Sequence, residues 1–411
     1  GEEVGAASTE NIRTNTNATF LQNINVGVAI TAGKLGIGFT DNNIKIGNTA
    51  LDSLTTGTNN VAVGGNCLTA ATTGTQNVAI GINALDVNTT GNYNEAIGGN
   101  ALGSNTTGSN NVAVGDGALA SNTTASNNIA IGLDALNDNT TGTRNIAVGN
   151  MALDEHTTGD YNVAIGYNSL TRDTSGTKNT AVGDSSLAYN TTGANNTAVG
   201  QGCLLYNTTA SNNTAIGQDA LKQNTTGTEN SALGSQALLS NTTGDANIAI
   251  GYEALDANTT GSNNTAVGRS SLGANTTADN NTALGYHALK VNTTGTNNVA
   301  VGSLALDANT TGDYNVCLGV SSLGNNTTGA NNTGLGWGSL GQNTTASNNV
   351  AVGYNCLGAN TTGTQNVAVG SYAMDASQTS NYNVAVGYDA MSSNTTGDDN
   401  VAVGYEALQT N

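Results

Sequence analysis

Apolar and polar positions recur along this chain with a period of 17 residues, which starts at Asn43 and continues to the last residue. Each copy follows the consensus N-V-A-V-G-x-x-A-L-x-x-N-T-T-G-x-N, and 22 copies, the last one incomplete, follow one another without insertion or deletion. A globular enzyme does not keep such a period, because its elements meet different neighbours, whereas each coil of a solenoid meets copies of itself. We therefore predict an all-β solenoid, or β-roll, of about 22 coils over residues 43–411.

Each unit divides into two short segments and a turn, with the leading Asn counted as position 1. Positions 1 to 4 are rich in β-branched residues and predict a short strand. Position 5 is always Gly, which permits positive φ or the close approach of another backbone. Positions 6 to 10 predict either a second strand or a single helical turn, with Leu at position 9 pointing inward. The N-T-T-G stretch at positions 12 to 15 predicts a turn.

Positions 4 and 9 are predicted to form the core of the coil. Position 4 is Val, Ile or Leu in every copy, and position 9 is Leu except at two Met residues. Positions 2 and 4 share one face of the strand, so position 2 joins this face. Representative core residues are Leu51, Leu68, Leu238, Leu408, Val401 and Val403.

Position 3 points to the opposite face of the strand and yet stays small, almost always Ala. A position that faces solvent would vary more widely in size and charge. Either the coil is very flat or another chain packs against this face. We expect the second arrangement, which implies lateral association between chains.

Asn side chains are predicted to form ladders along the stack, because stacking in register places each Asn on its own copy. The ladder at position 1 includes Asn43, Asn60, Asn77, Asn111 and Asn400. The N-T-T triplets also match the acceptor sequence for N-glycosylation. Candidate glycosylation sites are therefore Asn88, Asn105 and Asn122, unless Asn and Thr serve there only as turn residues.

Residues 1–42 lack the repeat and form a separate segment that we expect to cap or join the first coil. Apolar residues at Phe20, Ile24, Val26, Val28 and Ile30 are its candidate assembly interface. The last unit stays near consensus, although solenoids normally end in an atypical polar cap. Either the chain continues in a longer protein, or the C-terminal coil docks on the N-terminal segment of the next subunit.

Composition and charge narrow the possible functions. The formal net charge is −19, with 28 acidic and 9 basic residues, and this argues against nucleic-acid binding. No apolar run is long enough for a membrane span. The two His, four Cys and scattered carboxylates match no zinc site, dense calcium loop or catalytic triad. We expect no enzymatic activity, cofactor or metal, and we expect the four Cys to be buried thiols.

The strand motif resembles that of a known family. N-V-A-I-G occurs at 77–81 and 162–166, and V-A-V-G occurs in many other copies. This motif resembles the head repeats of trimeric autotransporter adhesins, and the Asn/Thr/Gly repeats are similar to shafts of phage or bacterial fibre proteins. The resemblance implies trimers of parallel β-rolls that bind host or matrix surfaces. This chain departs from the adhesins in its longer unit, and it shows neither a heptad stalk nor anchor strands.

The favoured function is a structural subunit of an extracellular or cell-surface fibre whose partners are copies of itself. The alternative is a surface adhesin or phage tail-fibre shaft, on the virion surface in the second case, that binds a receptor or glycan. A minor alternative is ice binding through stacked Thr. The Thr row at position 2 is interrupted, however, and contains only Thr180, Thr197, Thr214, Thr265, Thr282 and Thr333.

Overall fold

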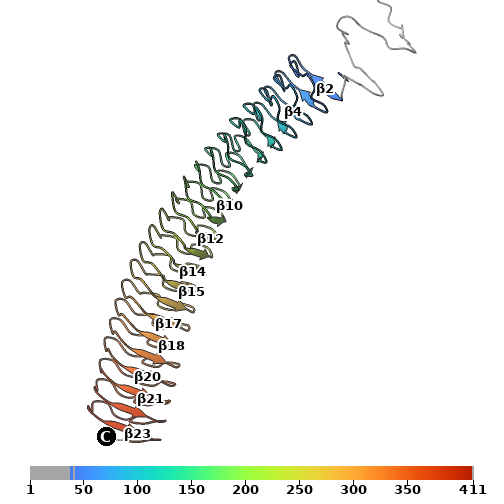
Figure 1. The fold of residues 1–411 in the computed structure, drawn as a ribbon. Helices are drawn as coiled ribbons and strands as arrows, with labels where there is room; N and C mark the ends of the chain where they lie inside the picture. The colour runs from blue at the N-terminus through green and yellow to red at the C-terminus, as the bar shows by residue number, and fades with distance from the viewer. Residues whose placement is uncertain (1–37, 40–41, 410–411) are drawn as a thin grey trace, which may run out of the picture. The chain divides into compact units, whose positions relative to one another are not determined.

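The computed structural model describes residues 38–39 and 42–409 (Figure 1). They belong to one unit of the chain, Gly38–Asn411, while residues 1–37 form another. The described residues are all-β, with 22 parallel strands stacked one per coil, which confirms the predicted β-solenoid. Positions 6 to 10 form consecutive turns, so neither a helical turn nor a second strand occurs there in the described coils. The candidate interface at Phe20, Ile24, Val26, Val28 and Ile30 lies outside the described residues.

The strands pair in register across one repeat, as Thr180–Val182 of one coil pairs with Thr197–Val199 of the next. The first strand, β1 (Gly38–Phe39), instead pairs antiparallel with β2 (Asn43–Ile46). The remaining strands cover positions 2 to 4 of their units: β3 (Val61–Val63), β4 (Val78–Ile80), β5 (Glu95–Ile97), β6 (Val112–Val114), β7 (Ile129–Ile131), β8 (Ile146–Val148), β9 (Val163–Ile165), β10 (Thr180–Val182), β11 (Thr197–Val199), β12 (Thr214–Ile216), β13 (Ser231–Leu233), β14 (Ile248–Ile250), β15 (Thr265–Val267), β16 (Thr282–Leu284), β17 (Val299–Val301), β18 (Val316–Leu318), β19 (Thr333–Leu335), β20 (Val350–Val352), β21 (Val367–Val369), β22 (Val384–Val386) and β23 (Val401–Val403).

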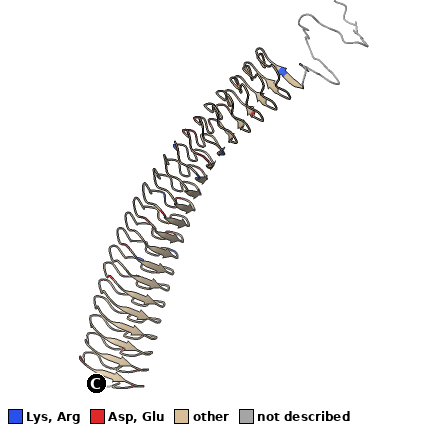
Figure 2. Ribbon diagram, viewed as in Figure 1, with Lys and Arg blue, Asp and Glu red and all other residues tan. Residues whose placement is uncertain are grey.

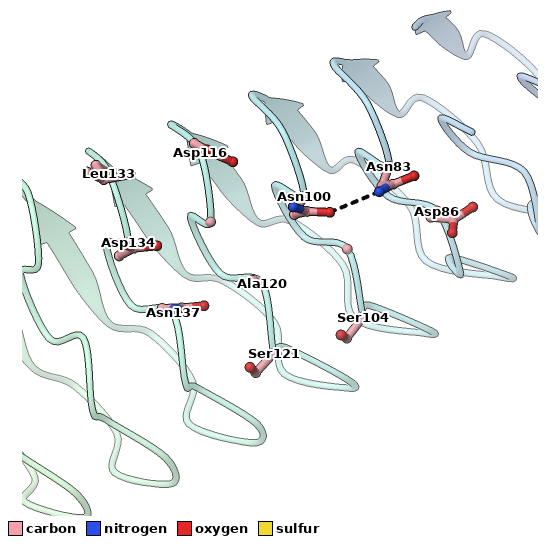
Figure 3. Close-up of a pocket in the computed structure, with 12 residues that line it drawn as sticks. Asn83, Asp86, Asn100, Ser104, Asp116, Ala120, Ser121, Leu133, Asp134 and Asn137 are labelled. Carbon is pink, nitrogen blue, oxygen red and sulfur yellow. Dashed lines mark hydrogen bonds between the residues drawn. The ribbon is translucent and has the colours of Figure 1, made fainter. Parts of the chain in front are cut away.

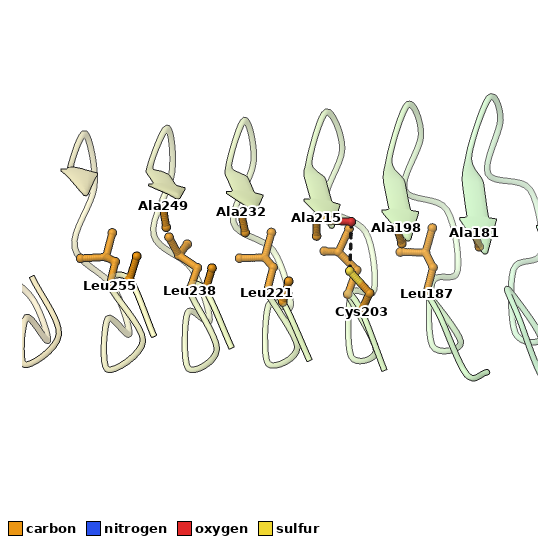
Figure 4. Packing of buried hydrophobic residues seen from close by; sticks show 14 of the residues in the cluster. Ala181, Leu187, Ala198, Cys203, Ala215, Leu221, Ala232, Leu238, Ala249 and Leu255 are labelled. Carbon is orange, nitrogen blue, oxygen red and sulfur yellow. Dashed lines mark hydrogen bonds between the residues drawn. The ribbon is translucent and has the colours of Figure 1, made fainter. Parts of the chain in front are cut away.

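The interior of each coil is narrow and is filled by three positions of the repeat. Small residues at position 3, Ala, Ser or Cys at position 8, and Leu or Met at position 9 form one continuous core (Figure 4). In the coils drawn there, the Leu side chains point across the coil toward the strand Ala. Leu51, Leu68 and Leu238 lie in this core, whereas Leu408 in the last described coil is 45% exposed.

The prediction that position 4 faces the core is wrong, and the sheet is turned the other way. Val401 and Val403 are 68% and 71% exposed, and positions 2 and 4 point outward throughout the stack. Position 3 points inward, where Ala215 and its equivalents are completely buried. A coil of 17 residues leaves room for Ala opposite Leu but not for Val or Ile opposite Leu. The small size of position 3 therefore reflects packing within its own coil, so the lateral partner predicted on that face is also wrong.

Position 9 combines a core side chain with an unusual backbone. Leu238 has φ of +52°, and the Leu or Met at this position has positive φ in all described coils. A left-handed conformation costs a non-glycine residue about 1–2 kcal/mol. Gly would relieve that cost but would leave the coil without its largest buried side chain. The fold therefore retains Leu, because burial of Leu outweighs the local strain.

Position 5 must be Gly because successive coils approach closely there. Gly251 has φ of +134°, a region that L side chains rarely adopt. A Cβ at Gly251 would lie 2.6 Å from the carbonyl oxygen of Gly268 in the next coil. Both the backbone conformation and the distance between coils exclude a side chain at this position.

Candidate functional site

The outer face of the sheet, which comprises positions 2 and 4 of all coils, is apolar and almost free of charge. Position 2 is Val, Ile, Thr or Ser in every unit except one, which has Glu95. Side chains such as Ile216 and Ile250 are each 39% exposed. Strands β6–β23 carry no charged residue, and the strands near the C-terminal end of Figure 2 are accordingly tan. Because the strands are in register, each position forms a continuous row along the stack.

The Asn residues at position 1 form a buried ladder that satisfies the backbone. Asn60 donates from Nδ2 to the carbonyl of Gly74 at 2.9 Å. Its Oδ1 accepts hydrogen bonds from the backbone N and the Nδ2 of Asn77, at 3.0 and 3.2 Å. The residues Asn43, Asn111 and Asn400 make the same kind of contact with the neighbouring coil. The ladder therefore has a structural role within the solenoid.

A second buried Asn ladder, at position 12, contains the three candidate glycosylation sites. Asn105 donates from Nδ2 to Asn88 Oδ1 at 2.9 Å and to the carbonyl of Gly108 at 3.0 Å. Asn122 repeats this contact with Asn105 at 2.8 Å, and all three Asn side chains are completely buried. A glycan on Nδ2 would need the space that the coil interior occupies. The burial of these three candidate side chains leaves no room for a glycan in the folded coil, and it agrees with the alternative that Asn and Thr serve there as turn residues.

His156 and Asp173 replace two consecutive Asn residues of this second ladder, and both are completely buried. His156 Nδ1 lies 2.7 Å from Asp173 Oδ2, and its Nε2 lies 2.8 Å from the carbonyl of Gly159. Both ring nitrogens of His156 therefore lie within hydrogen-bonding distance of an oxygen atom in the coil interior. Asp173 Oδ1 accepts from Asn190 Nδ2, while Asn139 Oδ1 is left without a partner.

The four Cys are buried free thiols, which agrees with the expectation from the sequence. Burial raises the pKa of Cys203, Cys317 and Cys356 to about 12. The pKa of Cys67 is also raised, again chiefly by burial. Since the thiolate is the reactive form, these side chains are inert in the folded coil.

A shallow groove runs along the turn segment between the rows at positions 7, 10 and 11. Figure 3 shows one stretch with a volume of about 630 Å³, lined by Asp86, Asp116 and Asp134 among polar and small residues. Asn83 donates to Asn100 Oδ1 at 3.1 Å along one wall.

Carboxylates cluster in the next stretch of the groove. The pKa of Asp154 is raised to about 6, first by burial and then by the nearby charges of Asp134, Asp138 and Glu155. Burial also raises the pKa of Asp256, with Glu253 adding to the effect. In the part of the chain that the structure describes, no three His, Cys, Asp or Glu residues are arranged to hold a metal ion. No helix that could cross a membrane occurs within the same residues.

Neither a family model nor a curated protein matches the chain.

Proposed function

We propose that this protein is a structural subunit that assembles laterally with copies of itself, by packing the outer faces of two sheets together. The observation that carries this proposal is the unbroken aliphatic row at position 4, beside the nearly uncharged row at position 2. A chain with net charge −19 has many acidic side chains available for solvated positions. Acidic side chains are nearly absent from the outer sheet face, as expected for a surface that becomes buried on assembly.

The area of the face is sufficient for a stable interface. It is about 10 Å wide, for a strand of three residues, and about 105 Å long, for 22 coils. Packing two such faces would bury about 1,000 Å² on each copy and about 2,000 Å² in total, above the roughly 1,600 Å² of a standard specific interface.

The repeat spacing favours a second copy of the chain as the partner. Coils recur every 4.8 Å or so in both copies, and stacked sheets pack at about 10 Å. The spacing of the side-chain rows therefore matches between two copies from one coil to the next. A partner with a different spacing would lose register after a few coils.

The test is a pair of variants with equal charge and different placement. We expect Ile216→Lys with Ile250→Lys to yield single rods, because each Lys would be buried without a partner in the sheet-to-sheet interface. The control is Thr226→Lys with Thr260→Lys, which adds the same charge at exposed turn positions of the same two coils. Sedimentation and electron microscopy of the intact protein measure the outcome. Single rods from the unmodified protein at high concentration, or equal assembly by both variants, would refute lateral packing.

Rods are also proposed to join end to end, which together with lateral packing would give a filament. A head-to-tail contact of this kind does not close, so it yields filaments. Deleting residues 1–33 should leave a rod that no longer elongates. Long filaments from that deletion variant would refute the end-to-end contact and leave the lateral contact to be judged by the Lys variants.

A further inference from the structure

Between residues 304 and 358, the residues that line the groove on the turn side of the coils differ from those of its other stretches. Here it has a volume of about 370 Å³, which is within the range of small-molecule sites. Position 10 is Gly in three successive coils along this stretch, and Gly324, Gly341 and Gly358 all line the groove. The same position carries Leu205 and Leu239 elsewhere, so the fold does not require Gly there.

One aromatic residue lines this part of the groove and begins a row of neighbouring aromatic rings. Trp337 lines it and is 50% exposed. Its ring stacks on that of Tyr354 with centroids 5.0 Å apart. The row continues through Tyr372, Tyr388 and Tyr405, with centroid distances of 5.3, 6.0 and 5.6 Å. Aromatic side chains that are apolar but remain exposed are suited to contact with a ligand that has both apolar and polar faces.

Amide side chains supply hydrogen-bonding groups beside Trp337. Asn325 donates from Nδ2 to the carbonyl of Gly341 at 2.9 Å and to Gln342 Oε1 at 3.2 Å. This contact orients the Gln342 amide and leaves its nitrogen to donate to a ligand. Asn355 extends over Gly358, where a Cβ would lie 2.5 Å from Asn355 Oδ1. Glycine at that position therefore makes room for the amide inside the groove.

The charge of the groove selects against an anionic ligand. Asp307 is the ionisable residue in its lining, and burial raises the pKa of that carboxyl group. The sequence contains no Lys or Arg after Lys290. The groove thus offers an indole, amides, backbone carbonyls and one acceptor carboxyl group. These groups complement a neutral molecule with many hydroxyl groups.

We propose that the groove between residues 304 and 358 binds a neutral oligosaccharide. A sugar ring contacts Trp337 through its C–H groups, while Gln342 and Asn355 bond its hydroxyls. The groove runs along the stack, so an extended glycan lies parallel to the solenoid axis and contacts successive coils. This site lies on the turn side of the coil, away from the outer sheet face proposed for assembly, so the two functions are independent.

Trp337 is the only tryptophan of the chain, so its fluorescence reports directly on this site. The intact protein is titrated with neutral hexasaccharides, namely β-1,4-linked glucose, α-1,4-linked glucose and β-1,4-linked N-acetylglucosamine. We expect a saturable change in emission with at least one of them, with Kd on the order of 1 mM or tighter. Polygalacturonate is the anionic comparison, and it should leave the emission unchanged.

Gly341→Leu tests the site while retaining the reporter, since it adds a bulky side chain at a residue that lines the groove next to Gln342. The affinity should fall by at least about tenfold. Ala188→Leu is the matched control, because it makes the same kind of change at position 10 of a distant coil and should bind as the unmodified protein does. Circular dichroism of both variants shows whether they are folded, and Gln342→Ala provides a milder test of the same groove. The proposal is overturned if none of the hexasaccharides changes the emission, if polygalacturonate binds equally well, or if folded Gly341→Leu and Gln342→Ala variants both retain full affinity.

Discussion

At the scale of single residues, this solenoid tolerates substitutions only where they reproduce the hydrogen bonds or the volume of the consensus residue. Cys takes the place of Ala in the core, and its pKa is raised by burial without other consequence. His156 and Asp173 replace two amides with a hydrogen-bonded pair in the same interior. The replacement interrupts the ladder, and Asn139 Oδ1 in the preceding coil has no hydrogen-bond partner.

The His156–Asp173 pair can be tested by a double-mutant cycle. Removing one member by His156→Asn or Asp173→Asn should reduce the free energy of unfolding by roughly 1–3 kcal/mol, because a buried polar group is left without its hydrogen-bond partner. The double variant His156→Asn/Asp173→Asn restores a uniform amide ladder and should be at least as stable as the unmodified protein, within about 1 kcal/mol. Denaturant unfolding measures all four forms. Additive losses in the double variant would show that the two residues do not act as a pair.

The raised pKa of Asp154, at about 6, predicts a pH dependence of stability. The folded state binds this proton more tightly than the unfolded chain, whose Asp titrates near the ordinary value of 3.8. Protonation therefore favours folding, and the stability falls as the pH rises through the interval between these values. We expect a higher melting temperature at about pH 5 than at about pH 8. Asp154→Asn should reduce this difference, and an unchanged difference in the variant would contradict the assignment.

At the scale of one element, a coil is held by its neighbours more than by its own hydrogen bonds. Its strand pairs with the strands on both sides, and its Thr hydroxyls also bond the next coil, as Thr106 Oγ1 does with Thr123 O at 3.0 Å. Gly at position 5 allows this close spacing. The stability of a coil therefore depends more on the distance to its neighbouring coils than on the identity of its exposed side chains.

Gly251→Ala tests that spacing. The added Cβ would meet the carbonyl of Gly268 at 2.6 Å in a backbone conformation that disfavours it. We expect a loss of roughly 3 kcal/mol or more in the free energy of unfolding, with local loss of coil structure. Gly65→Ala is the control, since no atom lies within 4 Å of the position that the added methyl group would take, and φ is not positive there. Equal shifts in melting temperature for the two variants would mean that close stacking at position 5 does not determine the stability of the solenoid.

At the scale of the whole molecule, stacking turns a short motif into long continuous surfaces. The outer sheet face carries almost no charge, the turn side carries a polar groove, and the Asn ladders lie between them in the interior. Two surfaces of different chemistry on opposite sides of a coil allow assembly through one and ligand contact through the other. The acidic net charge of −19 opposes close approach of copies at low ionic strength.

The solenoid unit is predicted to extend about 105 Å along its axis, for 22 coils at about 4.8 Å each. Small-angle scattering from the monomeric Ile216→Lys/Ile250→Lys variant should give a pair-distance distribution typical of a rod at least that long. A maximum dimension of roughly half this value would contradict single-file stacking of the coils.

The sequence by itself determined the coil length, the stacking in register, the need for Gly at position 5 and the burial of Leu at position 9. Each of these follows from a period that recurs without a break, because one repeat must fit on the next. Only the tertiary structure decided which face of the strand points inward. Alternation places positions 2 and 4 opposite position 3, but both sets are apolar, so the pattern is equally consistent with either orientation. The volume enclosed by a coil of 17 residues decides which face of the strand points inward. It has room for Ala215 opposite Leu, so Ile216 points outward. The same closure buries Asn88 and brings His156 to Asp173, contacts between units that no single copy of the repeat reveals.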